Sequence, residues 1–326
     1  MAGVHAHTPV LIEEVLAALT IDEGSRAAGY YLDATFGRGG HSAAILERLG
    51  VHGRLVALDR DLTAITHGKK VFGTESRLLL AHCDFGRVGE AVRAIVVDDV
   101  NWNGGFAGVL FDLGVSSPQL DDASRGFSFS HEGPLDMRMD NSKGATAAEW
   151  LARVREDEIV RVLREYGEER FAKRIARAIL SARAQQPLQT TAQLAAVVAA
   201  AVPTREPGKH PATRTFQAIR IQVNSELEQI KAALAQMLDL LLPDARLCVI
   251  SFHSLEDRIV KEFMQRHSQE DPVYAGLPHV PPHAQPKLRR IGRAIHPSAA
   301  EIERNPRARS AILRVAEKCD ATRWAA

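Results

Sequence analysis

Cysteine is scarce in this chain, which has only three among its 326 residues. Cys83, Cys248 and Cys319 form no Cys-x-x-Cys pair and their number is odd, so the sequence offers neither a disulfide framework nor a cysteine-based zinc site. We therefore expect no metal centre, and we expect the reducing environment of the cytoplasm.

Long apolar runs are also missing. The N-terminal stretch MAGVHAHTPVLIEEVLAAL has no basic segment ahead of its apolar residues, and Glu13 and Glu14 interrupt it. Such a stretch is typical of neither a signal peptide nor a membrane span. No other segment is apolar over a sufficient length, so we expect no association with a membrane.

The chain carries almost no net charge, since 41 Lys and Arg oppose 40 Asp and Glu. Whole-chain charge is a weak guide to nucleic-acid binding, because basic residues can gather locally. Apolar residues, in contrast, are abundant: 45% of the chain is hydrophobic, which is typical of an ordered globular protein. Its length predicts roughly two domains.

Short apolar runs alternate with helix-like segments between residues 30 and 115, which is the pattern of repeated βα units and a parallel sheet. Strands are expected at residues 30–35, 54–59, 77–82, 107–113, 245–252 and 310–318. Residues 271–306 are rich in proline and basic side chains and predict no element. The expected fold is therefore α/β, with a doubly wound, mostly parallel sheet.

The middle of the chain departs from this pattern. A long loop rich in Gly, Ser, Pro and Asp is expected at residues 114–144, followed by helices up to residue 202. One amphipathic helix is expected over residues 213–242, where apolar residues recur at helical spacing. We interpret the middle as an inserted all-helical substrate-recognition domain. The expected boundaries are 1–134 for the first part of the main domain, 135–215 for the insertion and 216–326 for the closing part.

A glycine-rich motif follows the first expected strand. Residues 33–42 read Asp-Ala-Thr-Phe-Gly-Arg-Gly-Gly-His-Ser and are expected to lead into a helix. Glycines there let the backbone approach a ligand at the carboxyl end of the sheet. A dinucleotide fingerprint requires Gly or Ala where Ser42 stands, and a P-loop requires a Lys before Ser or Thr, so the motif argues against both.

Acidic and aromatic residues follow the next two expected strands. Asp59 ends the second strand, where a carboxylate can accept hydrogen bonds from a ribose diol. Asp84 and Phe85 follow the third strand, where they could bind the amino group and the ring of an adenine. These features fit NAD and S-adenosylmethionine alike. The alternatives are a surface carboxylate at Asp59 and a core aromatic residue at Phe85.

The fourth expected strand ends in Asp112-Leu-Gly-Val-Ser-Ser-Pro-Gln-Leu-Asp121, which places a carboxylate at the carboxyl edge of the sheet. With this motif the sequence closely resembles the family of ribosomal small-subunit RNA (cytosine-N4)-methyltransferases, called RsmH or MraW. The other motifs that carry the resemblance are His7-Thr-Pro-Val10, Phe36-Gly-Arg-Gly-Gly-His41, Arg125-Gly-Phe-Ser-Phe129, Gly133-Pro-Leu-Asp-Met-Arg-Met-Asp140, Tyr166-Gly-Glu-Glu-Arg170, Arg214-Thr-Phe-Gln-Ala-Ile-Arg220, Asn224-Ser-Glu-Leu227 and Ser251-Phe-His-Ser-Leu-Glu-Asp-Arg258.

The resemblance implies a class I, Rossmann-like methyltransferase fold with S-adenosylmethionine as cofactor. It also implies a substrate, the exocyclic N4 amine of a cytosine in the decoding region of bacterial 16S ribosomal RNA within the small ribosomal subunit, and a cytoplasmic enzyme. The family's cofactor contacts correspond to Gly39, Gly40, His41, Asp59, Phe85, Asp112 and Gln119. No oligomeric state follows from the sequence.

Methylation of a cytosine amine needs a group that counters delocalisation of the nitrogen lone pair into the ring. A carboxylate or carbonyl that accepts an N–H bond favours the sp³ geometry of the nitrogen. Alignment of the nitrogen with the methyl group then lowers the barrier to transfer by proximity. Asp112, Ser116 and His253 are the candidates, in that order. Many amino-methyltransferases carry an Asp-Pro-Pro-Tyr-like motif where this chain has Asp-Leu-Gly-Val-Ser, so the choice stays open. Asp112 has the alternative role of positioning the cofactor, and His253 that of capping the helix after it.

Basic residues gather in three places that are candidates for contacts with RNA phosphates. They are Arg170, Lys173, Arg174, Arg177 and Arg183; Arg205, Lys209, His210, Arg214 and Arg220; and Lys287, Arg289, Arg290 and Arg293. Phe127 and Phe129 are candidates for stacking on an extruded base. The alternative for each basic residue is an ordinary solvated surface.

Two other functions fit parts of the pattern. A nicotinamide-dependent dehydrogenase shares the fold and the ribose carboxylate, but Ser42 departs from its fingerprint. A non-catalytic RNA-binding or assembly factor would keep the fold without methyl transfer, although Gly39, Gly40, Asp59 and Asp112 are all in place. Cofactor identity separates the first alternative from a methyltransferase, and a transfer assay separates the second.

Overall fold

The computed structural model describes residues 9–204, 208, 210–274 and 280–320. The chain divides into two compact units. The first, here called the sheet unit, comprises Met1–Gly114 and Leu227–Ala326, and the second, the helical unit, comprises Val115–Glu226. Across the described residues, no helix combines the length and the apolar character that a membrane span requires.

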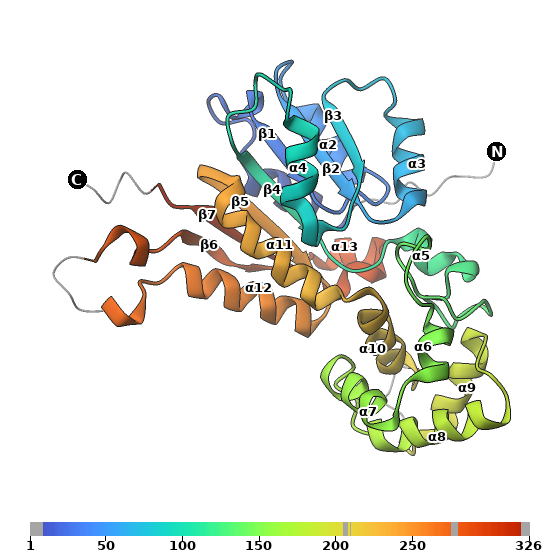
Figure 1. Ribbon diagram of the computed structural model, residues 1–326. Helices are drawn as coiled ribbons and strands as arrows, with labels where there is room; N and C mark the ends of the chain where they lie inside the picture. Colours follow the sequence, from blue (N-terminus) through green and yellow to red (C-terminus); the bar gives the residue numbers. More distant parts are fainter. Residues whose placement is uncertain (1–8, 205–207, 209, 275–279, 321–326) are drawn as a thin grey trace. The chain divides into compact units, whose positions relative to one another are not determined.

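The sheet unit is built on a seven-stranded sheet with the strand order β3-β2-β1-β4-β5-β7-β6 (Figure 1). The strands are β1 (Tyr30–Asp33), β2 (Arg54–Asp59), β3 (Leu78–His82), β4 (Phe106–Asp112), β5 (Leu241–Ser251), β6 (Leu288–Ile295) and β7 (Ile312–Lys318). β1 to β5 pair in parallel, and β7 is antiparallel to both β5 and β6. The strand order reverses between β1 and β4, which is where a doubly wound sheet opens a ligand-binding crevice at the carboxyl ends of its strands.

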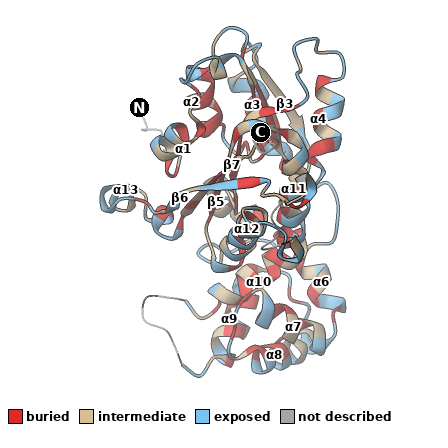
Figure 2. Ribbon diagram, turned by 90° about the vertical axis from the view of Figure 1, so that its left-hand side faces the viewer, coloured by how far each residue is buried: buried red, intermediate tan, exposed pale blue. Residues whose placement is uncertain are grey.

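Helices cover both faces of this sheet, as the buried side chains of its central strands require. On one face lie α1 (Ile12–Leu19), α2 (Gly40–Arg48) and α13 (Ala299–Arg304), and on the other lie α4 (Val88–Val96), α11 (Glu226–Leu240) and α12 (Ser254–His267) (Figure 2). The remaining helix, α3 (Leu62–Val71), packs beside β2 and β3. The α/β architecture expected from the sequence is confirmed.

The core of the sheet unit forms because its central strands are apolar on both faces. Tyr31, Leu55 and Leu110 are buried in neighbouring strands and belong to one cluster with Leu16 of α1 and Ile45 of α2. Burial of each such side chain contributes about 1.5–3 kcal/mol. The carboxyl ends of β1, β2 and β4 are thereby held on a rigid frame.

One strand of the sheet was not predicted. β6 lies at the sheet edge, where among the described residues it pairs with β7 alone, and Leu288 is its one buried residue. Arg289, Arg290 and Arg293 are exposed along it. The strand lacks the apolar run by which the other strands were recognised, and its charged side chains suit an exposed edge.

The helical unit contains α5 (Ser117–Asp121), α6 (Ala147–Arg153), α7 (Glu156–Glu165), α8 (Ala172–Gln185), α9 (Thr191–Ala201) and α10 (Thr213–Asn224). Its core comes from apolar residues at helical spacing, such as Ile175 and Ile179 of α8 and Leu194 and Val198 of α9, all of which are buried. This unit therefore has an apolar core of its own.

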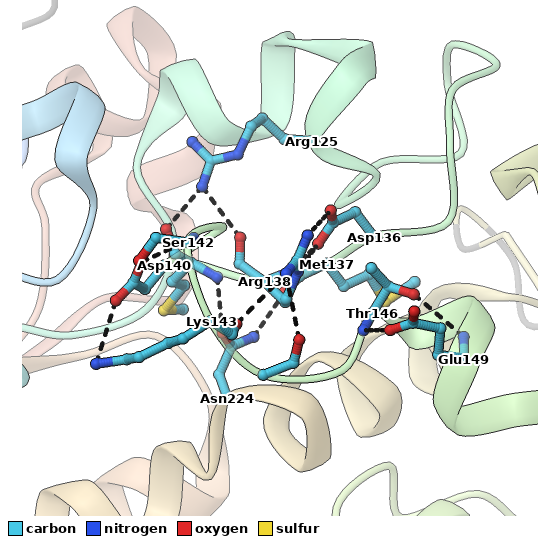
Figure 3. Close-up of polar contacts among 12 residues, drawn as sticks. Arg125, Asp136, Met137, Arg138, Asp140, Ser142, Lys143, Thr146, Glu149 and Asn224 are labelled. Atoms are coloured by element: carbon cyan, nitrogen blue, oxygen red, sulfur yellow. Dashed lines mark hydrogen bonds and ion pairs between the residues drawn. The ribbon is translucent and has the colours of Figure 1, made fainter. Parts of the chain in front are cut away.

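The segment expected to be a long loop packs into the helical core. Phe127, Leu135 and Met137 are buried there. Asn224, at the end of α10, accepts a hydrogen bond from the Met139 N–H at 2.7 Å and donates to the Met137 carbonyl at 2.7 Å (Figure 3). The helical unit accordingly spans Val115–Glu226, which is wider than the 135–215 expected from the sequence.

The prediction of one helix over residues 213–242 is wrong. The chain forms two helices, α10 and α11, that are separated at Ser225, whose φ of +49° is left-handed. Apolar residues keep their helical spacing on both sides of the break, so the pattern alone did not reveal it. The left-handed conformation costs about 1–2 kcal/mol for a residue with a side chain, and it falls at the border between the two units.

Candidate active site

The glycine-rich loop connects β1 to α2 at the carboxyl edge of the sheet. Gly37 and Gly39 have φ values of +55° and +79°, which glycine adopts without steric penalty. A Cβ atom on Gly39 would lie 2.7 Å from Cζ of Phe36, and one on Gly40 would lie 2.4 Å from Cγ of Pro9. The start of α2 therefore accepts no side chain at these two positions.

Asp33 holds this loop and α2 together. Its buried carboxylate accepts hydrogen bonds from Ser42 Oγ at 2.7 Å and from the Thr35 N–H at 3.1 Å. Burial raises the pKa of Asp33, while the hydrogen bonds from Ser42 and Thr35 lower it. Thr35 Oγ1 in turn accepts the Asp112 N–H at 2.6 Å, which ties the end of β4 to the end of β1. Ser42, the residue that departs from the dinucleotide fingerprint, is thus an anchor of α2.

Asp59 ends β2 and supports the same loop. Its Oδ2 accepts the Gly37 N–H at 2.7 Å and its Oδ1 accepts the Asp61 N–H at 2.8 Å. Burial raises the pKa of Asp59 to about 6. A carboxylate oxygen has two lone-pair sites, so both oxygens keep capacity for a hydroxyl donor.

Phe85 lies in a short 3₁₀ helix (Phe85–Arg87) just after β3. Its partly exposed ring packs edge-on against Phe111, with ring centroids 6.0 Å apart. Asp84 forms an ion pair with Arg60, whose Nε lies 3.0 Å from Asp84 Oδ1. Phe85 therefore packs against the core and is also partly accessible to a ligand. An adenine amino group would have to share the Asp84 carboxylate with Arg60.

Asp112 ends β4 and lies beside His41 of α2. Asp112 Oδ2 is 3.6 Å from His41 Nε2, and the two side chains are 26% and 7% exposed. Asp112 Oδ1 is buried and has no hydrogen-bond partner among the described residues. A buried carboxylate oxygen in this state costs free energy unless a ligand supplies a donor or a positive charge.

The electrostatics of the site reinforce this conclusion. Burial raises the pKa of Asp112 to about 8, with smaller contributions from the negative charges of Asp33 and Glu256. A nearby cation stabilises the ionised form of such a carboxyl group. The residues present therefore fit S-adenosylmethionine, which carries a sulfonium and an ammonium group.

His253 follows β5 and caps α12. Its Nδ1 accepts the Glu256 N–H at 3.4 Å, and its Nε2 lies 3.2 Å from Glu256 Oε1. Glu256, which is fully buried, also accepts the Phe252 N–H at 2.8 Å through Oε2. The capping role that the sequence left open for His253 is present, and any role toward the substrate would add to it.

Ser116 and Gln119 belong to the helical unit, where they form the N-terminal capping box of α5. The Gln119 side-chain oxygen accepts the Ser116 N–H at 3.0 Å, and Gln119 is buried. Sequence reasoning assigned these residues to the amine and the cofactor without foreseeing that they cap a helix. Their functional roles stay predictions.

The two phenylalanines proposed for base stacking differ in their surroundings. Phe127 is buried, with the Arg125 guanidinium 5.8 Å from its ring centroid, so the prediction that it stacks on a base is wrong. Phe129 is partly exposed and stacks on His210, with ring centroids 4.5 Å apart. Of the two, only Phe129 retains a ring accessible from solvent.

The basic residues proposed for RNA contacts also divide into groups. Lys173 and Arg174 are exposed on α8. Arg220 is not available, because both its Nε and its Nη2 lie 2.8 Å from the buried carboxylate of Glu226. Two further candidates, Arg205 and Lys209, lie outside the described residues.

Comparison with known proteins identifies the family. A family model described as the MraW methylase family matches residues 4–319. The chain belongs to this family. It is 55% identical over 314 residues to the ribosomal RNA small subunit methyltransferase H of Dechloromonas aromatica, covering 96% of this chain and 98% of that protein. It is 52% identical over 322 residues to the protein of the same name from Shewanella oneidensis, covering 98% of this chain and 100% of that protein.

Membership of the MraW methylase family confirms several expectations from the sequence. The sheet is that of a class I, Rossmann-like methyltransferase, and the cofactor is S-adenosylmethionine. The alternative of a nicotinamide-dependent dehydrogenase is wrong. Among solved structures, a putative rRNA methylase from Clostridium thermocellum aligns with a TM-score of 0.40 and 12% identity over 90% of this chain and 88% of that chain.

Three polar residues at the carboxyl ends of the parallel strands were not assigned a role from the sequence. Thr35 and Asp33 lie inside the glycine-rich motif, where nothing in their spacing marks them as the link between β1 and β4. Glu256 follows His253 at the three-residue spacing of a capping box, and that signal could have identified it.

Proposed function

We propose that this methyltransferase transfers a methyl group from S-adenosylmethionine to the exocyclic N4 amine of a cytosine in the decoding region of 16S ribosomal RNA, within the small ribosomal subunit and in the cytoplasm. The names of its relatives, at 55% and 52% identity, support a ribosomal RNA substrate. The observation that carries the proposal is that Asp112 Oδ1, at the carboxyl end of β4, is buried and has no hydrogen-bond partner in the described part of the chain.

The cofactor would be held along the carboxyl ends of β1 to β4. Gly39 and Gly40 form the turn that would face its amino-acid part, and packing against Phe36 and Pro9 leaves no room for a side chain on either glycine. Asp59 accepts the ribose hydroxyls, and Phe85 packs against the adenine. His41 lies beside Asp112 at the start of α2, and Gln119 of α5 is the last of the expected contacts.

The cofactor supplies an electrophilic methyl group on a positively charged sulfur. The protein has to orient the amine, because conjugation with the ring makes the nitrogen a weak nucleophile. An ionised Asp112 accepts an N–H bond from the amine, which favours the sp³ geometry and points the lone pair at the methyl carbon. The cationic cofactor itself favours this ionised form, since it lowers the pKa of a neighbouring carboxyl group.

Ser116 and His253 are the next candidates for orienting the amine. Both take part in helix caps, so their side chains are already directed by local hydrogen bonds. His253 could also take up the proton that the amine loses after transfer, provided its contact with Glu256 opens. Asp112 remains the first choice because its Oδ1 has no competing partner among the described residues.

The proposal is tested by transfer of a labelled methyl group from S-adenosylmethionine to unmodified small ribosomal subunits, with the modified nucleoside identified by mass spectrometry. We expect N4-methylated cytosine. Asp112→Asn should abolish transfer, whereas the matched control Asp98→Asn, which changes an exposed carboxylate, should leave it intact. Methylation at another nucleoside would contradict the assigned base, and cofactor binding without transfer would favour an assembly factor.

The exposed face of α8 gives a second test of the RNA substrate. Reversing the charges of Lys173, Arg174 and Arg177 together should raise the KM for small subunits and weaken its salt dependence, because fewer phosphates are neutralised. Arg177 is partly offset by Glu156, 3.2 Å away, so Lys173 and Arg174 should account for most of the effect. Unchanged activity over a range of salt would show that this face does not contact RNA.

A further inference from the structure

A cavity of about 670 Å³ lies on the sheet unit between α12, β6 and β7, on elements that carry none of the expected cofactor contacts. Its lining is strongly basic, and none of the described residues that line it has a carboxylate side chain. The basic residues are Lys261 of α12, Arg289, Arg290 and Arg293 of β6, and Arg314 of β7. We call this feature the α12–β6 groove.

Two of these five cations are already neutralised by carboxylates next to the groove. Arg289 pairs with Glu317, with Nη2 and Oε1 2.5 Å apart. Arg314 pairs with Asp257, with Nε and Oδ1 2.6 Å apart. Their charges are therefore largely satisfied within the protein.

The other three cations differ from Arg289 and Arg314 in this respect. Within the part of the chain that the structure describes, Lys261, Arg290 and Arg293 have no ion pair, and all three side chains are exposed. Lys261 comes from α12, and Arg290 and Arg293 come from β6. These two elements lie side by side (Figure 1). The groove thus concentrates uncompensated positive charge.

Protection of the edge strand is the ordinary explanation for charges on β6, because Lys and Arg discourage pairing with another strand. That explanation does not require Lys261, which is on α12 and not on the edge. The strand also bulges between Ile291 and Ile295, and Gly292 has a φ of +64° with no atom of the described residues within 4 Å of its Cβ position. A bulge already disfavours edge pairing, so the convergence of cations from a second element calls for another cause.

We infer that the α12–β6 groove binds the phosphate backbone of the RNA substrate, outside the nucleotide that is methylated. Arginine presents planar, forked donors that match phosphate oxygens, and a row of cations suits a polyanion better than it suits a single small anion. The inference rests on the proposed function, because it takes ribosomal RNA as the substrate.

The direction of β6 relates the groove to the candidate active site. β6 and β5 are both antiparallel to β7 and hence parallel to each other. The carboxyl end of β6, next to Arg293, therefore lies at the same end of the strands as Ser251, the last residue of β5. An RNA strand along β6 would run toward the edge that carries the candidate active site.

The test compares two triple charge reversals. One changes Lys261, Arg290 and Arg293 to Glu, and the other changes Lys69, Lys70 and Arg93 to Glu, which are exposed cations on α3 and α4. Binding of unmodified small ribosomal subunits is measured by filter binding from 50 to 200 mM salt. S-adenosylmethionine affinity is measured in parallel by calorimetry.

We expect the groove variant to bind subunits about tenfold or more weakly at 0.1 M salt, with the slope of log K against log salt reduced by roughly 2 to 3. Its S-adenosylmethionine affinity, and its kcat at saturating subunits, should match the wild type. The α3–α4 variant should show a smaller loss.

Equal losses of subunit affinity in the two variants would overturn the inference. A groove variant that keeps its subunit affinity but becomes less soluble would also overturn it, because the cations would then serve to protect the edge strand. If charge reversal destroys cofactor binding, the Gln triple variant decides instead, with at least a threefold loss of affinity for subunits expected. Failure of the proposed function looks different, since the wild type would then bind subunits without methylating them.

Discussion

His41 Nε2 lies 3.6 Å from Asp112 Oδ2, with α2 contributing the imidazole and β4 the carboxylate. This separation is longer than the 2.7–3.2 Å expected for a hydrogen bond between nitrogen and oxygen. His41 therefore does not hold Asp112 in its ionised form through a direct hydrogen bond. The carboxyl group is left with a raised pKa that a ligand can shift, and two predictions follow from this state.

The first prediction concerns the stability of the cofactor-free protein. Folding raises the pKa of Asp112 from 3.8 to about 8, so ionisation of this group opposes folding. Its stabilising contribution is complete below pH 4 and is lost as the pH rises toward 8. Asp112→Asn removes the ionisation and should raise the free energy of unfolding relative to wild type, by on the order of 2–5 kcal/mol at pH 9.

Urea unfolding at pH 5, 7 and 9 measures this difference. Asp98→Asn is the matched control, because Asp98 is exposed and its replacement should have nearly the same small effect at every pH. A stability difference between Asp112→Asn and wild type that does not grow from pH 5 to pH 9 would be inconsistent with a raised pKa at Asp112.

The second prediction concerns the pH dependence of cofactor affinity. A cation beside Asp112 favours the ionised carboxylate, so binding releases a proton when the pH is below about 8. Affinity for S-adenosylmethionine should therefore rise with pH, by up to about tenfold per pH unit between pH 6 and 8, and then level off. Calorimetry in buffers of different ionisation enthalpy measures both the affinity and the released proton. The dependence should be lost in Asp112→Asn, and an equal dependence in that variant would assign the proton to another group.

The elements that could be predicted from the sequence are those whose side chains are buried, and exposed elements were missed. Strands β1 to β5 and β7 have apolar runs because they are covered by helices or neighbouring strands, and such runs can be recognised in a sequence. β6 is exposed at the edge, and its arginines match no strand pattern. The break at Ser225 also escaped prediction, because a serine is an uncommon residue at a left-handed helix end.

The candidate site was predictable at the level of motifs. Gly39, Asp59 and Asp112 each follow or end a strand, and parallel strands bring their carboxyl ends to one edge. The contacts that support them were not predictable, because they join residues far apart in sequence. The 2.6 Å hydrogen bond from the Asp112 N–H to Thr35 Oγ1 is one of these, since it depends on β1 and β4 being neighbours.

A third prediction separates two effects of glycine in the cofactor loop. Gly39→Ala introduces a Cβ at positive φ that would also lie 2.7 Å from the rings of Phe36 and Phe72. Gly104→Ala is the control, because Gly104 has a φ of +91° but no atom of the described chain lies within 4 Å of its Cβ position. Both variants should lose about 1–2 kcal/mol from the left-handed backbone. Only Gly39→Ala should also weaken S-adenosylmethionine binding, by about tenfold or more, as the clash moves the loop. Equal cofactor affinities in the two variants would exclude the loop from the binding site.

The fourth prediction concerns the helical unit, where Asn224 connects α10 to the segment before α6 (Figure 3). Its side chain exchanges hydrogen bonds of 2.7 Å with the backbone of Met137 and Met139, and it is almost fully buried. Asn224→Ala leaves a buried N–H and a buried carbonyl unpaired, which should cost about 2–4 kcal/mol. Asn101→Ala removes an exposed amide and should change stability by less than about 0.5 kcal/mol.

Chemical denaturation followed by far-ultraviolet circular dichroism measures both variants, because α6 to α10 dominate the signal of the helical unit. The loss in Asn224→Ala should appear in the transition of that unit, while S-adenosylmethionine affinity should change little, since the expected contacts that hold the cofactor lie mainly in the sheet unit. A variant that keeps wild-type stability would mean that the Met137–Met139 segment is held by its packing in the helical core and not by the amide.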